Sequence, residues 1–334
     1  MYRNLVAVID SGIDVSNKNI IDKVDYMVNI EKSKYSIKLD YNNVQDNLGH
    51  GTNCVDTILQ VEPASRFYII KIINKDGLSS SSLLLEALKL CINLPVKVIC
   101  ISLSITSLSC KYEKELFEIC EILFNKNKIL CVSDNNNFSN SLPAIFKNVI
   151  GVKAHYEDNI LFKIDESKDI QVEGLAKPIY VQGINNNFNF FKGSSKANAM
   201  FTGYVVRELL STKEDLNLNK VILNLKNKFK NSYNENYEVI NDKDIYLDLE
   251  YNKEIIDYIV YIKNKFSEQK NLSFNDILQK PIIYDGVSFF NFYMFFELII
   301  KKFNMKIDDY HKLKIDDVCT LPNLVNFIKR GGYN

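Results

Sequence analysis

The stretch Leu5-Val6-Ala7-Val8-Ile9-Asp10-Ser11-Gly12 places five consecutive apolar residues directly before an aspartate, a serine and a glycine. A continuous apolar run, without alternation of apolar and polar residues, is typical of a strand that is buried on both faces of a parallel sheet. Parallel sheets have their ligand sites at the carboxyl ends of their strands. The stretch therefore predicts a central strand over residues 5–9, with Asp10 at the edge of a site.

Further apolar, β-branched runs follow, with helical patterns between them. The predicted strands are residues 24–28, 67–73, 96–103, 128–132 and 149–153, and the predicted helices are residues 51–59, 81–94, 112–125 and 195–210. An alternation of strands and helices is typical of an α/β domain. We therefore expect a mostly parallel sheet flanked by helices over residues 1–212.

The pattern changes after residue 212. Residues 213–249 are dense in Asn and Lys, and we expect them to be a connecting region. Helical patterns return over residues 255–266, 289–303 and 321–329, which predicts a small α-helical domain over residues 250–334. The aromatic residues Phe289, Phe292 and Phe296 have the spacing of a buried helix face.

Composition excludes several classes of protein. Hydrophobic residues make up 46% of the 334, so the chain is not disordered. Lys and Arg number 41, as do Asp and Glu, and a net charge of zero gives no electrostatic basis for binding nucleic acid or a membrane. The longest apolar-rich run, residues 287–300, is shorter than the about 20 residues of a membrane helix. Seven cysteines without metal-ligand spacing fit reduced core thiols, so we expect a cytoplasmic protein.

Three polar residues carry the candidate chemistry. Asp10 follows the first strand, and His50 lies between glycines at the start of a predicted helix. Ser195 opens another helix, where the helix dipole favours developing negative charge. Taken singly, each residue also fits a structural role, as a turn aspartate, a surface histidine or a serine N-cap.

Taken together and in this order, the three segments resemble the motifs of the subtilisin-like serine proteases, the subtilases. The family motifs are Asp-Ser/Thr-Gly-Ile/Val-Asp, His-Gly-Thr-His and Gly-Thr-Ser-Met-Ala. The chain has Asp-Ser-Gly-Ile-Asp at residues 10–14, His-Gly-Thr-Asn at 50–53 and Gly-Ser-Ser-Lys-Ala at 193–197. The order Asp, His, Ser is that of subtilisin. The resemblance spans residues 4–212.

The resemblance implies a serine endopeptidase that cleaves a peptide or protein by acyl transfer. It implies that Ser195 is the nucleophile, that His50 is the general base and then the general acid, and that Asp10 orients His50. Asn135 is implied as the oxyanion donor, with Asn136 as the next candidate.

Two further features follow from the resemblance. The segment Ser102-Leu103-Ser104 is similar to the family strand that ends in Ser-Leu-Gly, which implies that it pairs with the substrate backbone. The chain also departs from the family pattern, because it has Lys196 after the nucleophile, Ala199-Met200 in place of Pro-His, and Asp134 beside the oxyanion Asn.

We expect a compact intracellular form that needs no prosegment, disulfide, metal or cofactor. The first predicted strand begins at once, and we identify no acidic cluster with the character of a calcium site. Subtilases of this kind often serve a dedicated substrate, including removal of a leader peptide in peptide maturation. The alternative is a catalytically weak binding or scaffold protein of the same fold in a biosynthetic pathway.

The C-terminal region resembles an acyl or peptidyl carrier protein. Residues 297–303 and 317–328 are similar to the carrier segments Leu-Glu-Glu-Glu-Phe and Thr-Val…Ile. Carriers attach phosphopantetheine to the Ser of an Asp-Ser-Leu motif, and the nearest serine here is Ser288, which follows a valine. Three interpretations stay open: loading at Ser288, a module that recruits the substrate or a protein partner, and a plain helical bundle.

Overall fold

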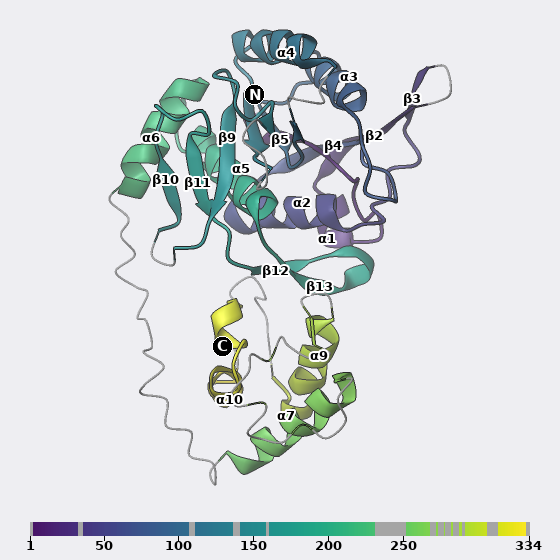
Figure 1. Cartoon of the computed structure of the whole chain (residues 1–334), viewed down its shortest axis with the longest axis vertical. Helices are drawn as coiled ribbons and strands as arrows, with labels where there is room; N and C mark the ends of the chain where they lie inside the picture. Colours follow the sequence, from purple (N-terminus) through teal and green to yellow (C-terminus); the bar gives the residue numbers. More distant parts are fainter. Residues whose placement is uncertain are drawn as a thin grey trace. The chain divides into compact units, whose positions relative to one another are not determined.

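The computed structural model describes residues 3–32, 36–106, 111–135, 141–157, 160–230, 252–267, 272, 277, 282, 287–288, 291–305 and 313–331 (Figure 1). The chain divides into two compact units. The first comprises Met1–Lys177, Gln182–Asn186 and Lys192–Glu235, and the second comprises Pro178–Val181, Asn187–Phe191 and Asn236–Asn334.

A nine-stranded, mostly parallel sheet forms the frame of the first unit, which confirms the predicted fold class. Its order is β10-β11-β9-β7-β5-β1-β4-β2-β3, with β10 and β3 pairing antiparallel at the two edges. All six predicted strands are present, although their ends are shifted. The three strands of the sheet that were not predicted, β3, β10 and β11, have only three or four residues, too few to show a hydrophobic pattern. The strands are β1 (Leu5–Asp10), β2 (Val24–Lys32), β3 (Ile37–Asp40), β4 (Arg66–Lys71), β5 (Val98–Ile101), β7 (Ile129–Ser133), β9 (Ile150–His155), β10 (Phe162–Ile164) and β11 (Val172–Leu175). Two further short strands, β6 (Ile105–Thr106) and β8 (Ser141–Leu142), pair with each other.

Helices pack on both faces of this sheet (Figure 1). Helices α2 (His50–Val61) and α5 (Ser194–Leu210) pack against each other, and α3 (Ser81–Cys91) packs against α4 (Glu113–Asn125). Gly203 permits the close approach of α5 to α2, because a Cβ at this position would lie 2.6 Å from the Cβ of Val61. The four predicted helices are therefore confirmed; α2 begins at His50, and Ser195 is the second residue of α5. A short helix, α1 (Lys18–Ile21), precedes β2.

The predicted connecting region begins with a helix. Helix α6 (Leu218–Lys230) packs against α5 and β10 in the first unit. Its buried residues have the spacing of one helix face, and they are Leu218, Val221, Ile222 and Leu225. The Asn and Lys residues between these positions dominate the composition and conceal the spacing. Residues 231–249, the rest of the predicted connection, lie outside the described residues.

The second unit combines helices with a small sheet that comes from the middle of the chain. Its described helices are α7 (Lys253–Phe266), α9 (Phe292–Phe303) and α10 (Leu321–Lys329), and its two strands are β12 (Ile179–Gln182) and β13 (Phe188–Phe191). Tyr180 and Phe190 belong to the same buried cluster as Phe292 and Phe296. The ring centroids of Phe190 and Phe292 are 5.0 Å apart. The aromatic stripe is therefore core at Phe292 and Phe296, while Phe289 lies outside the described residues.

None of the helices in the described ranges is both long and apolar enough to cross a bilayer. Of the six described cysteines, five are buried and form no disulfide, which agrees with the expectation of reduced core thiols, and Cys319 is half-buried. The seventh, Cys110, lies outside these ranges.

Removal of residues 249–334 should destabilise the remaining chain. Tyr180 and Phe190 would lose their buried neighbours on α9, and full burial of such a side chain is worth about 1.5–3 kcal/mol. We expect the 1–248 fragment to melt several degrees below the whole chain or to aggregate. The same fragment with Tyr180→Ser and Phe190→Ser is the control, and it should regain solubility. An unchanged melting midpoint of the unmodified fragment would show instead that the helices are an independent module.

Candidate active site

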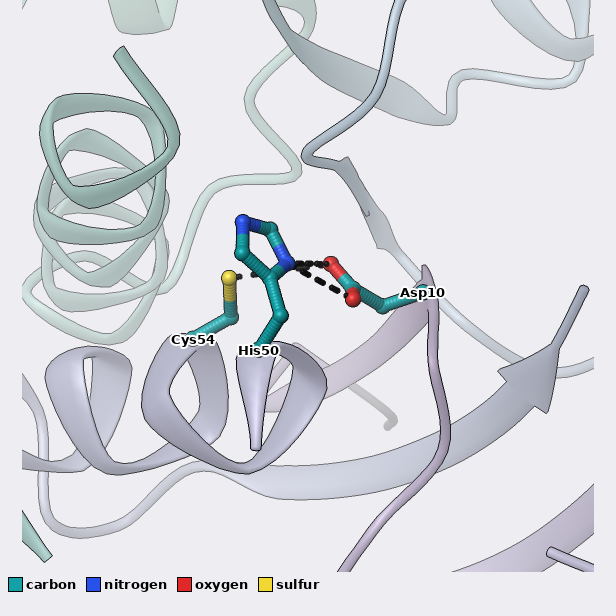
Figure 2. Close-up of side chains that lie close together, drawn as sticks. All are labelled: Asp10, His50 and Cys54. Carbon is teal, nitrogen blue, oxygen red and sulfur yellow. Dashed lines mark hydrogen bonds and ion pairs between the residues drawn. The ribbon is translucent and has the colours of Figure 1, made fainter. Parts of the chain in front are cut away.

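Asp10 and His50 form a hydrogen-bonded pair at the carboxyl edge of the sheet (Figure 2). Asp10 is the last residue of β1, and His50 is the first residue of α2. Nδ1 of His50 lies 2.8 Å and 3.0 Å from the two carboxylate oxygens of Asp10. The side chain of Asp10 is 1% exposed and that of His50 is 33% exposed. The imidazole can therefore be reached from solvent, whereas the carboxylate beneath it cannot.

Two opposing effects set the pKa of His50. Burial lowers this pKa, while the charge and hydrogen bond of Asp10, and the charge of Asp46, raise it, and the net pKa is raised. A histidine whose pKa is higher in the folded than in the unfolded state stabilises the fold fully below the unfolded pKa. That stabilisation is lost as the pH rises through the folded pKa.

The buried carboxylate of Asp46 holds the loop that leads to His50. It accepts five hydrogen bonds of 2.8–3.0 Å, from the hydroxyls of Ser11 and Thr52 and the amides of Leu48, Gly49 and Thr52. The Thr52 amide lies in the first turn of α2, where backbone N–H groups have no helical acceptor. Because Gly49, the N-cap residue, has no side chain to cap the helix, Asp46 performs that task from a distance.

Small residues allow the segment after β1 to lie against the start of α2. A Cβ on Gly51 would lie 2.3 Å from the Gly12 carbonyl oxygen and 3.3 Å from the Cβ of Asp10. The hydroxyl of Ser11 accepts a hydrogen bond of 2.9 Å from the Gly51 amide. The sequence motifs contain Ser11, Gly12 and Gly51, whereas Asp46 lies outside them, and the positioning roles of all four residues emerge only from the structure.

Ser195 lies in the first turn of α5, beside the end of the strand next to β1. Its Oγ donates a hydrogen bond of 3.3 Å to the carbonyl of Ser102. Ser102 directly follows β5, and β5 pairs with β1 in the register Ile9↔Ile101. Asp10, the last residue of β1, and Ser102, the first residue after β5, therefore lie at the same level of neighbouring strands. The structure thus brings the segments of Asp10, His50 and Ser195 to the ends of two adjacent strands.

Two buried polar residues fix the beginning of α5. Nδ2 of Asn198 donates to the carbonyls of Ile101, at 3.1 Å, and Cys131, at 3.3 Å, in β5 and β7. Nζ of Lys196 donates to the carbonyl of Leu175 at 2.8 Å. Burial lowers the pKa of Lys196 to about 7. The amine of Lys196, a departure from the family pattern, is therefore bound at the end of β11.

The structure places the remaining predicted site residues near the ends of β5 and β7. Asn135 is half-buried after β7, and its amide donates to the Ser141 hydroxyl at 2.8 Å. Ser102, Leu103 and Ser104 lie between β5 and β6 rather than in a strand, so the predicted strand ends earlier than expected. Asn136 lies outside the described residues. These positions leave the roles of Asn135 and of residues 102–104 as predictions.

Cys54 is the third side chain of the cluster in Figure 2, and no sequence motif singles it out. It lies four residues after His50, on the same face of α2. Its Sγ is 3.7 Å from Oδ2 of Asp10, and the ligand atoms of Asp10, His50 and Cys54 all lie within 4.8 Å of one another. Burial and the charge of Asp10 raise the pKa of this thiol well above its usual range. A protonated thiol is a poor metal ligand, and the absence of a metal stays a prediction.

Ser288 lies in the second unit, just before α9. Its hydroxyl donates to Oδ1 of Asn291 at 3.2 Å and accepts from the Asn291 amide at 3.3 Å. Such reciprocal bonds are an ordinary way to begin a helix. Neither loading at Ser288 nor the carrier-like character of this region goes beyond a prediction.

Asp46→Ala should lower the free energy of unfolding by about 3 kcal/mol, because buried donors would lose their shared acceptor. Urea unfolding measures this loss. Asp76→Ala is the matched control, since Asp76 is exposed and its removal should change stability by no more than about 0.5 kcal/mol. Equal stability of the two variants would show that Asp46 does not brace the loop.

Comparison with known proteins agrees with this arrangement. The model of the subtilase family matches residues 3–224. The matched range includes the nine-stranded sheet, helices α2 and α5, and Asp10, His50 and Ser195. A comparison with curated proteins finds no match. Because the family match covers well over half of the chain, the chain belongs to the subtilase family of serine proteases.

Proposed function

We propose that the chain is a serine endopeptidase that cleaves a peptide or protein by acyl transfer at Ser195. The Asp10–His50 pair, joined at 2.8 Å at the end of β1, is the observation that carries this proposal. Nδ1 of His50 donates to Asp10, which leaves Nε2 to take the proton of the Ser195 hydroxyl and return it to the leaving amine. Asp10 then stabilises the imidazolium.

The Ser195 hydroxyl must turn before it can react. In the structure it donates to the carbonyl of Ser102, and a hydroxyl rotates freely enough to change its acceptor. Catalytic hydrogen bonds are often looser in the free enzyme than in the complex with substrate. Rotation toward His50 upon substrate binding would align the nucleophile with its base.

Asn135 and the Ser195 amide are the proposed oxyanion donors. The place of Asn135 after β7, the neighbour of β5, supports this role. The Ser195 amide lies in the first turn of α5, where N–H groups have no helical acceptor. Loss of one such donor typically lowers the rate by about 10²–10³-fold. Residues 102–104 would pair with the substrate backbone beside these donors.

We further propose a cytoplasmic protease with a dedicated substrate, such as a peptide whose leader it removes. The buried free cysteines support a reducing compartment. The second unit would recruit the substrate or a protein partner, because its packed aromatic core gives it a defined surface. The hydrogen bonds committed to His50 and its loop argue against a mere scaffold, which needs no such pair.

Labelling with a fluorophosphonate probe tests the proposal. The reagent should label the wild-type chain, and Ser195→Ala should abolish labelling while costing only about 1 kcal/mol of stability, the worth of its hydrogen bond to the Ser102 carbonyl. Ser194→Ala is the matched control at the neighbouring position and should keep the label. A wild-type chain that stays unlabelled, or equal labelling of Ser195→Ala, would contradict the proposal and favour the scaffold alternative.

A further inference from the structure

A cavity of about 550 Å³ lies at the carboxyl ends of β2 and β4, on the edge of the sheet where β1 ends at Asp10. Its walls come from the ends of β2 and β4, the loop that leads to His50, and the start of α3. Apolar side chains such as Ile72 and Leu83 line part of it, and polar side chains line the rest. Its size is in the range of cavities that hold a small ligand or part of one.

The cavity lies one strand away from Asp10, at the same level of the sheet. Lys71, one of its lining residues, pairs with Asp10 in the register of β4 and β1. The amide of the next lining residue, Ile72, donates to the Asp10 carbonyl at 2.9 Å. Asn47, on another wall, lies in the loop held by Asp46. A side chain near the scissile bond of a bound peptide could therefore enter this cavity.

Positive charge exceeds negative charge around the cavity. Lys32, Lys71 and Lys75 line it, against Glu31 as the single acidic residue of its described lining. Lys71 is 5% exposed, and its Nζ donates to the Gln45 carbonyl at 2.5 Å. Within the described part of the chain, none of the three lysines has a carboxylate within 4.0 Å.

Other features of the cavity also favour an anion. Burial lowers the pKa of Lys71, and the charges of Asp46 and Glu31 offset this lowering only in part. A bound anion would therefore stabilise the charged form of Lys71. Helix α3 presents its amino end here, since its N-cap Ser80 lines the cavity, and that end of a helix carries positive potential. The apolar walls lower the local dielectric, which strengthens an ion pair formed inside.

We propose that this cavity binds an aspartate or glutamate side chain of the substrate, close to the scissile bond. The inference rests on the proposed peptidase function and narrows its substrate class. The substrate carboxylate would accept charge-assisted hydrogen bonds from Lys71 and, at the rim, from Lys32 or Lys75. A basic side chain at the same substrate position would be repelled, so the cavity would select by charge in both directions.

A peptide library with acetylated and amidated ends tests the inference, because blocked ends leave side chains as the carboxylate source. Cleavage products identified by mass spectrometry should show Asp or Glu enriched at one position relative to the cleaved bond. A peptide with Glu at that position should have a kcat/KM at least about tenfold above its isosteric Gln counterpart.

Variants of the cavity assign the preference to its lysines. Lys32→Glu and Lys75→Glu reverse charges on exposed side chains and should reduce the preference for Glu over Gln and improve cleavage of peptides with Lys at that position. Lys71→Met should abolish the preference for Glu over Gln. If this buried substitution prevents folding, Lys32→Glu and Lys75→Glu still test the inference. Lys126→Glu is the matched control, since Lys126 is exposed and precedes β7 at the opposite end of the sheet.

The outcomes separate this inference from the proposed function. Cleavage that depends on Ser195 but shows no acidic preference would overturn the inference and leave the peptidase standing. An acidic preference that survives in the Lys32, Lys75 and Lys71 variants would also overturn it. A library that stays uncut, with no labelling by fluorophosphonate, would overturn the proposed function, and the inference would fall with it.

Discussion

Five hydrogen-bond donors converge on the buried carboxylate of Asp46, and their geometry decides where His50 stands. A buried carboxylate is costly unless such donors surround it. The loop before His50 and the first turn of α2 therefore close around Asp46 in one arrangement. Ser11 takes part as well, so the same network fixes the segment after β1. His50 meets Asp10 because both segments are held to one carboxylate.

The central strand β1 lies between β5 and β4, and each of these strands leads to a different part of the candidate site. On one side β5 leads to Ser102, whose carbonyl accepts the Ser195 hydroxyl. On the other side β4 ends at Lys71, which lines the cavity together with Lys32 and Lys75. The proposed chemistry and the proposed substrate recognition thus lie on opposite sides of Asp10. Sheets of this topology place their sites where neighbouring connections leave the strand ends open.

Sequence patterns predicted the fold wherever burial is continuous. The apolar run before Asp10 is buried throughout and forms β1, because a strand covered on both faces has no polar positions. Helix α6 escaped prediction, since its four buried residues are separated by Asn and Lys and a further leucine, Leu223, is exposed. The short edge strands escaped for a related reason: three or four residues are too few to show a period.

The sequence predicted the candidate catalytic residues but not the residues that hold them in place. Asp10, His50 and Ser195 stand out because their residue types match a known reaction. The roles of Asp46 and Asn198 depend on contacts across distant segments, which no local pattern encodes. The aromatic residues Tyr180 and Phe190 belong to the core of the second unit, although they precede its helices by more than sixty residues. Their place depends on tertiary packing alone.

The titration of His50 tests the central claim, that the charge and hydrogen bond of Asp10, together with the charge of Asp46, outweigh the burial of the imidazole. NMR of the Ser195→Ala chain can follow the His50 ring signals, identified by their loss in His50→Gln. The account predicts a His50 pKa above the ordinary value of 6.5, and a lower pKa in the additional presence of Asp10→Asn. A pKa at or below 6.5 that does not respond to Asp10→Asn would contradict the account.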